Sequence, residues 1–292
     1  MAVTTLSGNL LSRRPSLLLK AWRRLLRDRA GIISLVMILL TLLIALLAPL
    51  LAPHDPLVGD FASVLQMPSS KYWFGTDELG RDVLSRILYG ARVSMAVGLL
   101  SQIAVVIVGI PIGAVAGLRG GWVDYMLMRI IDVMSALPSL LFYILLMIAL
   151  GRGLFNIVLA MSITGWIGIA RLVRGQVLSL KATDYVRAAT AMGAGSGWII
   201  AKHLIRNSLS PVFVSVTLGV PGAIFAEAGL SLLGLGIPPP NPSWGQMIGE
   251  GSRYFRTHPH LILYPSIALT FTILFWMLLG EALQKALDPT GS

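Results

Sequence analysis

The chain has 292 residues, of which 55% are hydrophobic and only 12% are charged. Because soluble domains carry about a quarter charged residues, this composition excludes an ordinary soluble fold and indicates a membrane protein. The net charge of +10 would suggest a nucleic-acid partner in a soluble chain, and the absence of cysteine excludes disulfides and thiolate metal sites.

Six stretches are apolar and long enough to cross a hydrocarbon core of about 30 Å, which needs about 20 helical residues. They lie at about 31–53, 93–118, 130–150, 154–173, 209–234 and 261–283. The sequence therefore predicts an all-α, polytopic fold with six transmembrane helices. We expect a basic cytoplasmic segment over residues 1–30 and one integrated transmembrane domain over residues 31–292.

Positive charge gathers in two blocks that six spans place on the same side. The first block holds Arg13, Arg14, Lys20, Arg23, Arg24, Arg27 and Arg29 against Asp28, and the second holds Arg171, Arg174, Lys181, Arg187, Lys202 and Arg206 against Asp184. The positive-inside bias puts both blocks and both termini in the cytoplasm. Topology thus explains the charge, and no nucleic-acid partner is expected. The basic leader and the apolar run exceed those of a signal peptide, so the first span should remain as an anchor.

The first outer segment, about 54–91, ends in a pattern of helical spacing. Its apolar positions are Val83, Leu84, Ile87 and Leu88, with Arg81, Asp82, Ser85 and Arg86 between them. This pattern predicts an amphipathic helix at the outer interface that leads into the second span.

The second span contains small residues at four-residue intervals, Gly109, Gly113 and Gly117. Such a ladder lets another transmembrane helix approach closely. Pro111 lies between two of the glycines and predicts a local kink that neighbouring helices support.

The connection between spans four and five, about 174–208, is too long for a simple turn. Thr183 or Asp184 can cap a first helix, and residues 193–195, Gly-Ala-Gly, end it before Ser196 caps a second. One face of the first helix collects Tyr185, Ala188, Ala189 and Met192. So short an exposed helix buries little area alone, and we expect its small apolar face to dock into a groove of a soluble partner.

Residues 184–194, DYVRAATAMGA, followed by HLIRN at 203–207, resemble the EAA loop of bacterial ABC importer permeases. Further matches lie at residues 75–81, 120–124, 226–231, 233–236, 242–245 and 287–289. Together, over about residues 20–290, they resemble the C-type permease of dipeptide, oligopeptide and nickel importers.

The resemblance implies a type I ABC importer permease fold in a bacterial inner membrane. It also implies a second, B-type permease, two ATP-binding subunits that hold ATP and Mg, an extracytoplasmic solute-binding protein and surrounding lipid. The implied ATPase-coupling residues are Asp184, Tyr185, Arg187, Ala188, Ala189, Met192 and Gly193. The family's acidic residue is Arg187 here and its usual proline is Arg206, which leaves Ala188, Ala189 and Gly193 as the transferable core.

Two acidic residues inside or beside apolar spans are candidates for translocation or gating. Glu227 lies in span five, where an unpaired carboxylate is costly, so it either contacts cargo or accepts hydrogen bonds from a neighbouring span. Asp132, with Arg129 before it and Pro138 after it, forms either a charged gate or interfacial charges that cap a kinked helix.

After span five, residues 237–245 include four prolines and cannot be helical throughout. We expect a rigid outer loop, anchored at the interface by Trp244, that meets a solute-binding protein.

Sequence chemistry gives no reason to expect an enzyme. No lysine follows a glycine, so the phosphate-binding GxxxxGK[ST] loop is absent and ATP hydrolysis is expected in partner subunits. His258 and His260 flank a proline without further ligands in view, so no metal site or resident cofactor is expected.

Three alternatives stay open from the sequence. The cargo is a dipeptide or oligopeptide, or alternatively nickel or a metal chelate. A rival of another class is an ion-coupled secondary transporter that uses Glu227 or Asp132, although no inverted repeat is detected. A third is a membrane scaffold whose cytoplasmic hairpin is a docking platform.

Overall fold

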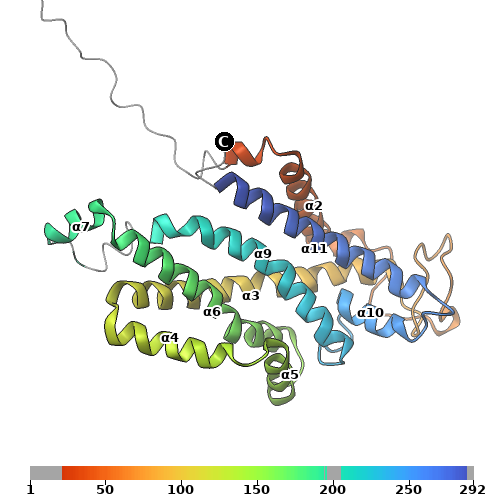
Figure 1. Ribbon diagram of the computed structural model, residues 1–292. Helices are drawn as coiled ribbons and strands as arrows, with labels where there is room; N and C mark the ends of the chain where they lie inside the picture. The colour runs from red at the N-terminus through yellow and green to blue at the C-terminus, as the bar shows by residue number, and fades with distance from the viewer. Residues whose placement is uncertain (1–21, 194, 196–204, 288–292) are drawn as a thin grey trace, which may run out of the picture.

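The computed structural model describes residues 22–193, 195 and 205–287, and Figure 1 shows them as a bundle of long helices. Within these residues there is no β-strand, only an isolated bridge between Thr76 and Asp82. The predicted all-α class is confirmed.

The helices follow one another along the chain, with longer segments before α3, between α7 and α9, and between α9 and α10. Their bounds are α2 Arg29–Leu51, η1 Phe61–Ser63, α3 Val83–Arg119, α4 Gly121–Ser135, α5 Ser139–Leu150, α6 Leu154–Lys181, α7 Asp184–Ala191, α9 Ile205–Leu232, α10 Trp244–Ser252 and α11 His260–Leu287.

Five of the described helices are long and apolar enough to cross a membrane, namely α2, α3, α6, α9 and α11. The predicted third span is not one straight helix, because α4 and α5 meet at an angle of 83°. Pro138, at this break, lacks a backbone donor and disfavours the helical conformation of Leu137.

The bent pair α4 and α5 still connects the two ends of the bundle. α4 starts at Gly121, directly after the end of α3, whereas Arg152, just beyond α5, donates to the carbonyl of Gly234 beyond α9 at 3.0 Å. Counting the pair as one broken span gives six candidate spans among the described helices, the number predicted.

The two ends of the bundle carry different elements (Figure 1). At one end, here called the α7 end, α6 stops, α7 projects, and Leu25 packs on Ala282 and Ala286 near the end of α11. At the other, the α10 end, lie residues 52–82 and α10. The positions of Leu25 and α11 place the described N-terminal and C-terminal residues at the same end.

α3 and α6 pack closely along the predicted glycine ladder. A Cβ on Gly109 would lie 2.8 Å from Cβ of Ile169, and one on Gly117 would lie 2.8 Å from Cβ of Val177. A Cβ on Gly113 would overlap the Ala170 carbonyl oxygen. These separations are too short for real side chains, so the role predicted for the three glycines is confirmed.

The amphipathic helix predicted at residues 83–91 is part of α3 and is continuous with the second span. Asp82 caps it, its carboxylate accepting from the Ser85 amide at 2.8 Å. The expectation that its polar side meets the outer interface is wrong, since Arg86 is only 1% exposed. Ion pairs to another element replace water around that side, as described below.

The connection after span four is shorter than predicted, because α6 continues to Lys181. Lys181 donates to the Leu118 carbonyl at the end of α3, at 2.8 Å. Arg174, earlier in α6, donates to both carboxylate oxygens of Asp124 at 2.5 and 2.6 Å. These contacts give the polar end of α6 partners on α3 and α4, which apolar content alone does not reveal.

Candidate functional site

The predicted helix after span four is present as α7, Asp184–Ala191. The carbonyl of Thr183 accepts from the amides of Val186 and Arg187 at 3.2 and 3.1 Å and so starts the helix. Gly193 has a φ of +81°, a left-handed conformation that glycine adopts without the cost of a Cβ. The predicted break after α7 is therefore confirmed, whereas the second helix expected from Ser196 lies outside the described residues.

Among the α7 side chains that the structure describes, Val186 attaches the helix to the bundle and others are free for contact. Val186 is 2% exposed and packs in a cluster with Val177 of α6 and Val212 of α9. On α7 and just after it, Ala188 is exposed and Met192 is 81% exposed. The attachment point was missed from the sequence, because a single valine gives no periodic signal.

The other predicted coupling residues are placed only in part. Asp184 and Arg187 are exposed and lie on the same short helix. The side chains of Tyr185 and Ala189 lie outside what the structure describes, although their backbone belongs to α7.

The structure does not bring Asp132 and Arg129 together as a gate. Asp132 pairs with Arg171 of α6 at 2.9 Å, and both side chains are about half exposed. Arg129 instead donates to the hydroxyl of Tyr125 at 3.2 Å and lies over its ring. An ion pair that exposed stabilises by only about 0–1 kcal/mol in water.

Glu227 lies inside α9 and is 0% exposed. Its Oε1 accepts hydrogen bonds from Ser231 at 2.7 Å and from Ser243 at 2.8 Å. Its Oε2 is buried and has no hydrogen-bond partner among the described residues. The carboxyl thus joins α9 to the residue that precedes α10.

α10, Trp244–Ser252, is a helix that the sequence analysis did not predict. Ser243 caps it, accepting from the Gln246 amide at 3.2 Å. Trp244 is 2% exposed and donates to the Ile87 carbonyl at 3.0 Å, so its predicted role as an interfacial anchor is wrong. A Cβ on Gly245 would overlap Ala228, so this glycine lets α10 approach α9. Residues 237–243, which contain the four prolines and precede α10, are non-helical, as predicted.

An ion-pair network connects α10 to the start of α3 and to the segment before it. Arg86 pairs with Glu250 of α10 at 3.0 Å and with Asp77 at 3.3 Å. Arg81 pairs with Asp77 at 2.7 Å, and Gln246 donates to Glu250 at 2.9 Å. Two cations and two carboxylates thus balance within a largely buried cluster, which the sequence analysis missed.

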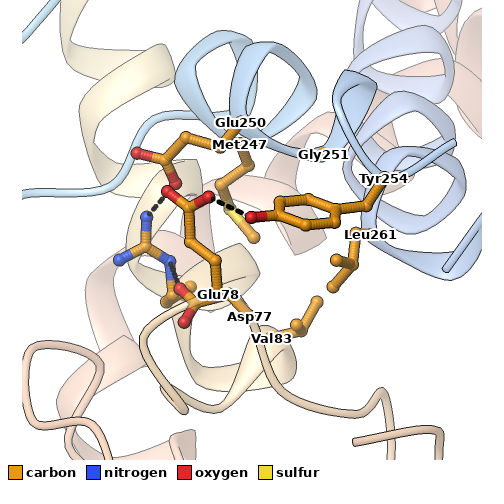
Figure 2. Close-up of a pocket in the computed structure, with 9 residues that line it drawn as sticks. Asp77, Glu78, Val83, Met247, Glu250, Gly251, Tyr254 and Leu261 are labelled. Atoms are coloured by element: carbon orange, nitrogen blue, oxygen red, sulfur yellow. Dashed lines mark hydrogen bonds and ion pairs between the residues drawn. The ribbon is translucent and has the colours of Figure 1, made fainter. Parts of the chain in front are cut away.

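Figure 2 shows the neighbouring cavity, with Glu78 and Tyr254 pointing toward one another across it. The hydroxyl of Tyr254 donates to the Glu78 carboxylate at 2.9 Å. This hydrogen bond raises the pKa of Tyr254 above its ordinary value. The contact gives residues 76–82 a second attachment to the segment between α10 and α11.

His258 and His260 lie near each other, with ring centroids 5.9 Å apart. In the part of the chain that the structure describes, no group of three or more histidine, cysteine, aspartate or glutamate side chains is placed to hold a metal ion.

Comparison with known proteins agrees with this architecture. The family described as "Binding-protein-dependent transport system inner membrane component" matches residues 109–290, and "N-terminal TM domain of oligopeptide transport permease C" matches residues 16–68. The chain belongs to this family of permeases. It is therefore a membrane-spanning permease subunit of an ABC importer, and the family is one of permeases rather than ATPases.

Several relatives are similar over nearly their whole length. The dipeptide transport system permease protein DppC of Bacillus subtilis is 43% identical, covering 95% of this chain and 88% of the relative. The oligopeptide transport system permease protein OppC of the same organism is 40% identical, covering 92% and 88%. The glutathione transport system permease protein GsiD of Pectobacterium atrosepticum is 39% identical, covering 92% and 89%.

Among solved structures, an inward-facing MetNI methionine ABC transporter matches with a TM-score of 0.57 and 17% identity. The match covers 70% of this chain and 97% of that chain. It supports the type I importer permease fold.

Proposed function

We propose that this chain is the C-type permease of an ATP-driven importer for dipeptides or oligopeptides. Support for this cargo comes from the names of DppC and OppC, which are similar to the chain over more than nine-tenths of its length. The complete transporter then contains a second, B-type permease, two ATP-binding subunits and an extracytoplasmic binding protein. ATP and Mg are bound by the ATP-binding subunits, and this chain hydrolyses no ATP itself.

The charge distribution orients the subunit in the bacterial inner membrane. The α7 end carries Arg23, Arg24, Arg27, Arg119, Lys181 and Arg187. By the positive-inside bias this end faces the cytoplasm, so both termini are cytoplasmic and α10 lies outside. Residues 1–30 are then the cytoplasmic lead, and residues 31–292 the transmembrane domain.

The observation that carries the coupling proposal is the placement of α7. Its Val186 packs on α6 and α9, whereas Ala188 and Met192 are exposed beyond the bundle. A small, apolar, exposed surface at the cytoplasmic end suits docking into a groove of an ATP-binding subunit. Asp184, Tyr185, Arg187 and Ala189 lie on the same helix and complete the proposed contact surface.

Docking at α7 gives ATP-driven closure a mechanical route into the membrane. α6 leads into α7, and α9 begins at Ile205 after the intervening segment. Movement of α7 therefore acts on two transmembrane helices at once, and tilting them switches the path between its inward-facing and outward-facing states.

The test is uptake into proteoliposomes that contain the complete transporter and its binding protein. We expect labelled dipeptide to accumulate only with ATP inside the vesicles, and not with an ion gradient alone. Uptake driven by the gradient without ATP would favour a secondary transporter. Purification with unrelated partners, without a second permease or ATPase, would favour a scaffold.

Substitutions on α7 test the coupling surface. Ala188→Glu places an unpaired carboxylate in the docking surface, and Gly193→Pro forbids the left-handed conformation after α7. Each should reduce uptake at least about tenfold, the effect of about 1.4 kcal/mol. ATP hydrolysis should no longer track uptake. The matched control is Ala62→Glu, the same change at an exposed alanine of the α10 end, which should leave ATPase docking intact. Unchanged uptake in the α7 variants would refute the coupling role.

A further inference from the structure

A buried carboxyl within a transmembrane helix commonly marks an ion or substrate path. Glu227 differs from that pattern in its partners. Both of its hydrogen bonds come from serine hydroxyls, Ser231 on its own helix and Ser243 at the cap of α10. Both are accepted by Oε1, and no salt bridge to Glu227 is found among the described residues.

α10 depends on such contacts because it has only nine residues, and helices this short have little stability of their own. Its start is held on α9 by the Glu227–Ser243 hydrogen bond and by the close approach of Gly245 to Ala228. Its far half is held on the start of α3 by the pair of Glu250 with Arg86.

We propose that Glu227 is a positioning residue that fixes the start of α10 to α9, so that the two helices move as one unit. In this assignment the carboxyl acts as a hydrogen-bond acceptor for Ser231 and Ser243, and it neither carries an ion nor contacts cargo. The ion pairs of Glu250 then extend the unit to residues 77–86.

This role rests on the proposed function for its consequence in transport. α9 runs from Ile205, next to the coupling segment, to Leu232, next to α10. If α9 and α10 move together, a displacement produced at the cytoplasmic end by the ATPases reaches the external surface that α10 helps to form. Loss of the Glu227 contact should then separate ATP hydrolysis from the response to the binding protein.

Two substitutions separate the acceptor role from a charge-based role. Glu227→Gln keeps a carbonyl oxygen in place of Oε1, which can accept from both serines. We expect stimulation of ATP hydrolysis by the loaded binding protein, and uptake, to stay within about threefold of wild type, a modest hydrogen-bond change. Glu227→Ala removes both hydrogen bonds and should reduce the stimulated rate about tenfold or more, while basal hydrolysis persists.

A covalent link offers a rescue that a general folding defect would not allow. A Cβ at position 249 would lie 3.6 Å from Cα of Leu232, so cysteines at these positions are close to disulfide geometry. The chain contains no cysteine, so Leu232→Cys with Gly249→Cys forms the only pair in this subunit. Oxidation of this pair should leave wild-type transport intact, and it should restore binding-protein stimulation to the Glu227→Ala variant.

The measurements are made on the complete transporter in proteoliposomes, with the reduced cysteine pair as the matched control. Loss of uptake in Glu227→Gln would overturn the proposal. The proposal would also be overturned if the disulfide abolished uptake in the background with wild-type Glu227 and reduction restored it. If Glu227→Ala fails to assemble, the Gln variant and the disulfide in the wild-type background still test whether Glu227 is a positioning residue.

Failure of the proposed function gives a different result. In that case the wild-type complex shows no ATP-driven peptide uptake, whereas the rate of disulfide formation between positions 232 and 249 remains measurable in membranes. That rate should be lower in Glu227→Ala than in wild type, and an equal rate would also refute the positioning role.

Discussion

Replacing Gly113 by alanine tests whether α3 and α6 pack as closely as the glycine ladder indicates. The added Cβ would overlap the carbonyl oxygen of Ala170 and would lie 2.9 Å from Cβ of Val173. Two carbon atoms prefer a separation of about 3.5–4.0 Å, so α6 must move away by at least about 0.6 Å. Both neighbours are backbone or β-branched atoms, and neither can rotate out of the way.

The expected cost combines two opposing terms. Overpacking a well-packed contact costs about 1–3 kcal/mol, whereas alanine gains about 1 kcal/mol over glycine in a helix. The net destabilisation of Gly113→Ala is therefore about 0–2 kcal/mol. Gly168 of α6 is the matched control, because a Cβ there would meet nothing within 4 Å. Gly168→Ala should gain the helix preference of alanine without the overpacking cost, and it should therefore stabilise the folded subunit by up to about 1 kcal/mol.

The assay is reversible unfolding of the purified subunit in mixed micelles, followed by helical circular dichroism. The informative quantity is the difference between the two variants, about 1–3 kcal/mol, since the helix term cancels. Equal stability of the Gly113 and Gly168 variants would show that the two helices are further apart than described, and would remove the packing argument for all three glycines of the ladder.

Two further substitutions test buried contacts. Val186→Ala removes two methyl-sized groups and should weaken the attachment of α7 by about 1.5 kcal/mol, measured as faster amide hydrogen exchange in α7. Met192→Ala, at an exposed position, is the control and should leave exchange in α7 unchanged. Arg86→Met removes the closest cation of Glu250 while Arg81 remains at 3.5 Å, and it should destabilise by about 1–3 kcal/mol. The double variant with Glu250→Met should cost less than the sum of the single changes, and simple additivity in a double-mutant cycle would contradict the ion pair.

Local patterns allowed the sequence to predict much of the fold. Apolar runs of membrane length located the spans, and four-residue spacing identified Gly109, Gly113 and Gly117 as a packing surface. The start of α7 at Asp184 and its end before Gly193 were also predictable, since capping and the left-handed break depend on neighbouring residues.

Contacts between distant residues were not predictable in the same way. Arg86 and Glu250 are 164 positions apart, so nothing in either local pattern indicates that they pair. For the same reason Arg86 was taken as the polar side of an interfacial helix, although it is buried. α10 was missed because its nine residues span too few turns to show a period and follow four prolines. Trp244 accordingly looked like an interfacial anchor, whereas its indole nitrogen binds the carbonyl of Ile87.

α3 connects the two regions that these contacts define. Toward the α7 end it packs on α6 through Gly109, Gly113 and Gly117, and toward the α10 end a Cβ on Gly98 would lie 2.9 Å from Val220 of α9. Residues 99–108 between these regions contain neither glycine nor proline, the residues at which helices usually bend. In the proposed coupling, a movement that tilts α6 is transmitted along this part of α3 to α9, whereas Pro111 is a place where α3 can bend nearer the α7 end. The Glu227–Ser243 hydrogen bond joins α9 to the start of α10, so the two proposed routes from α7, through α6 and through α9, lead to the same helix, α10.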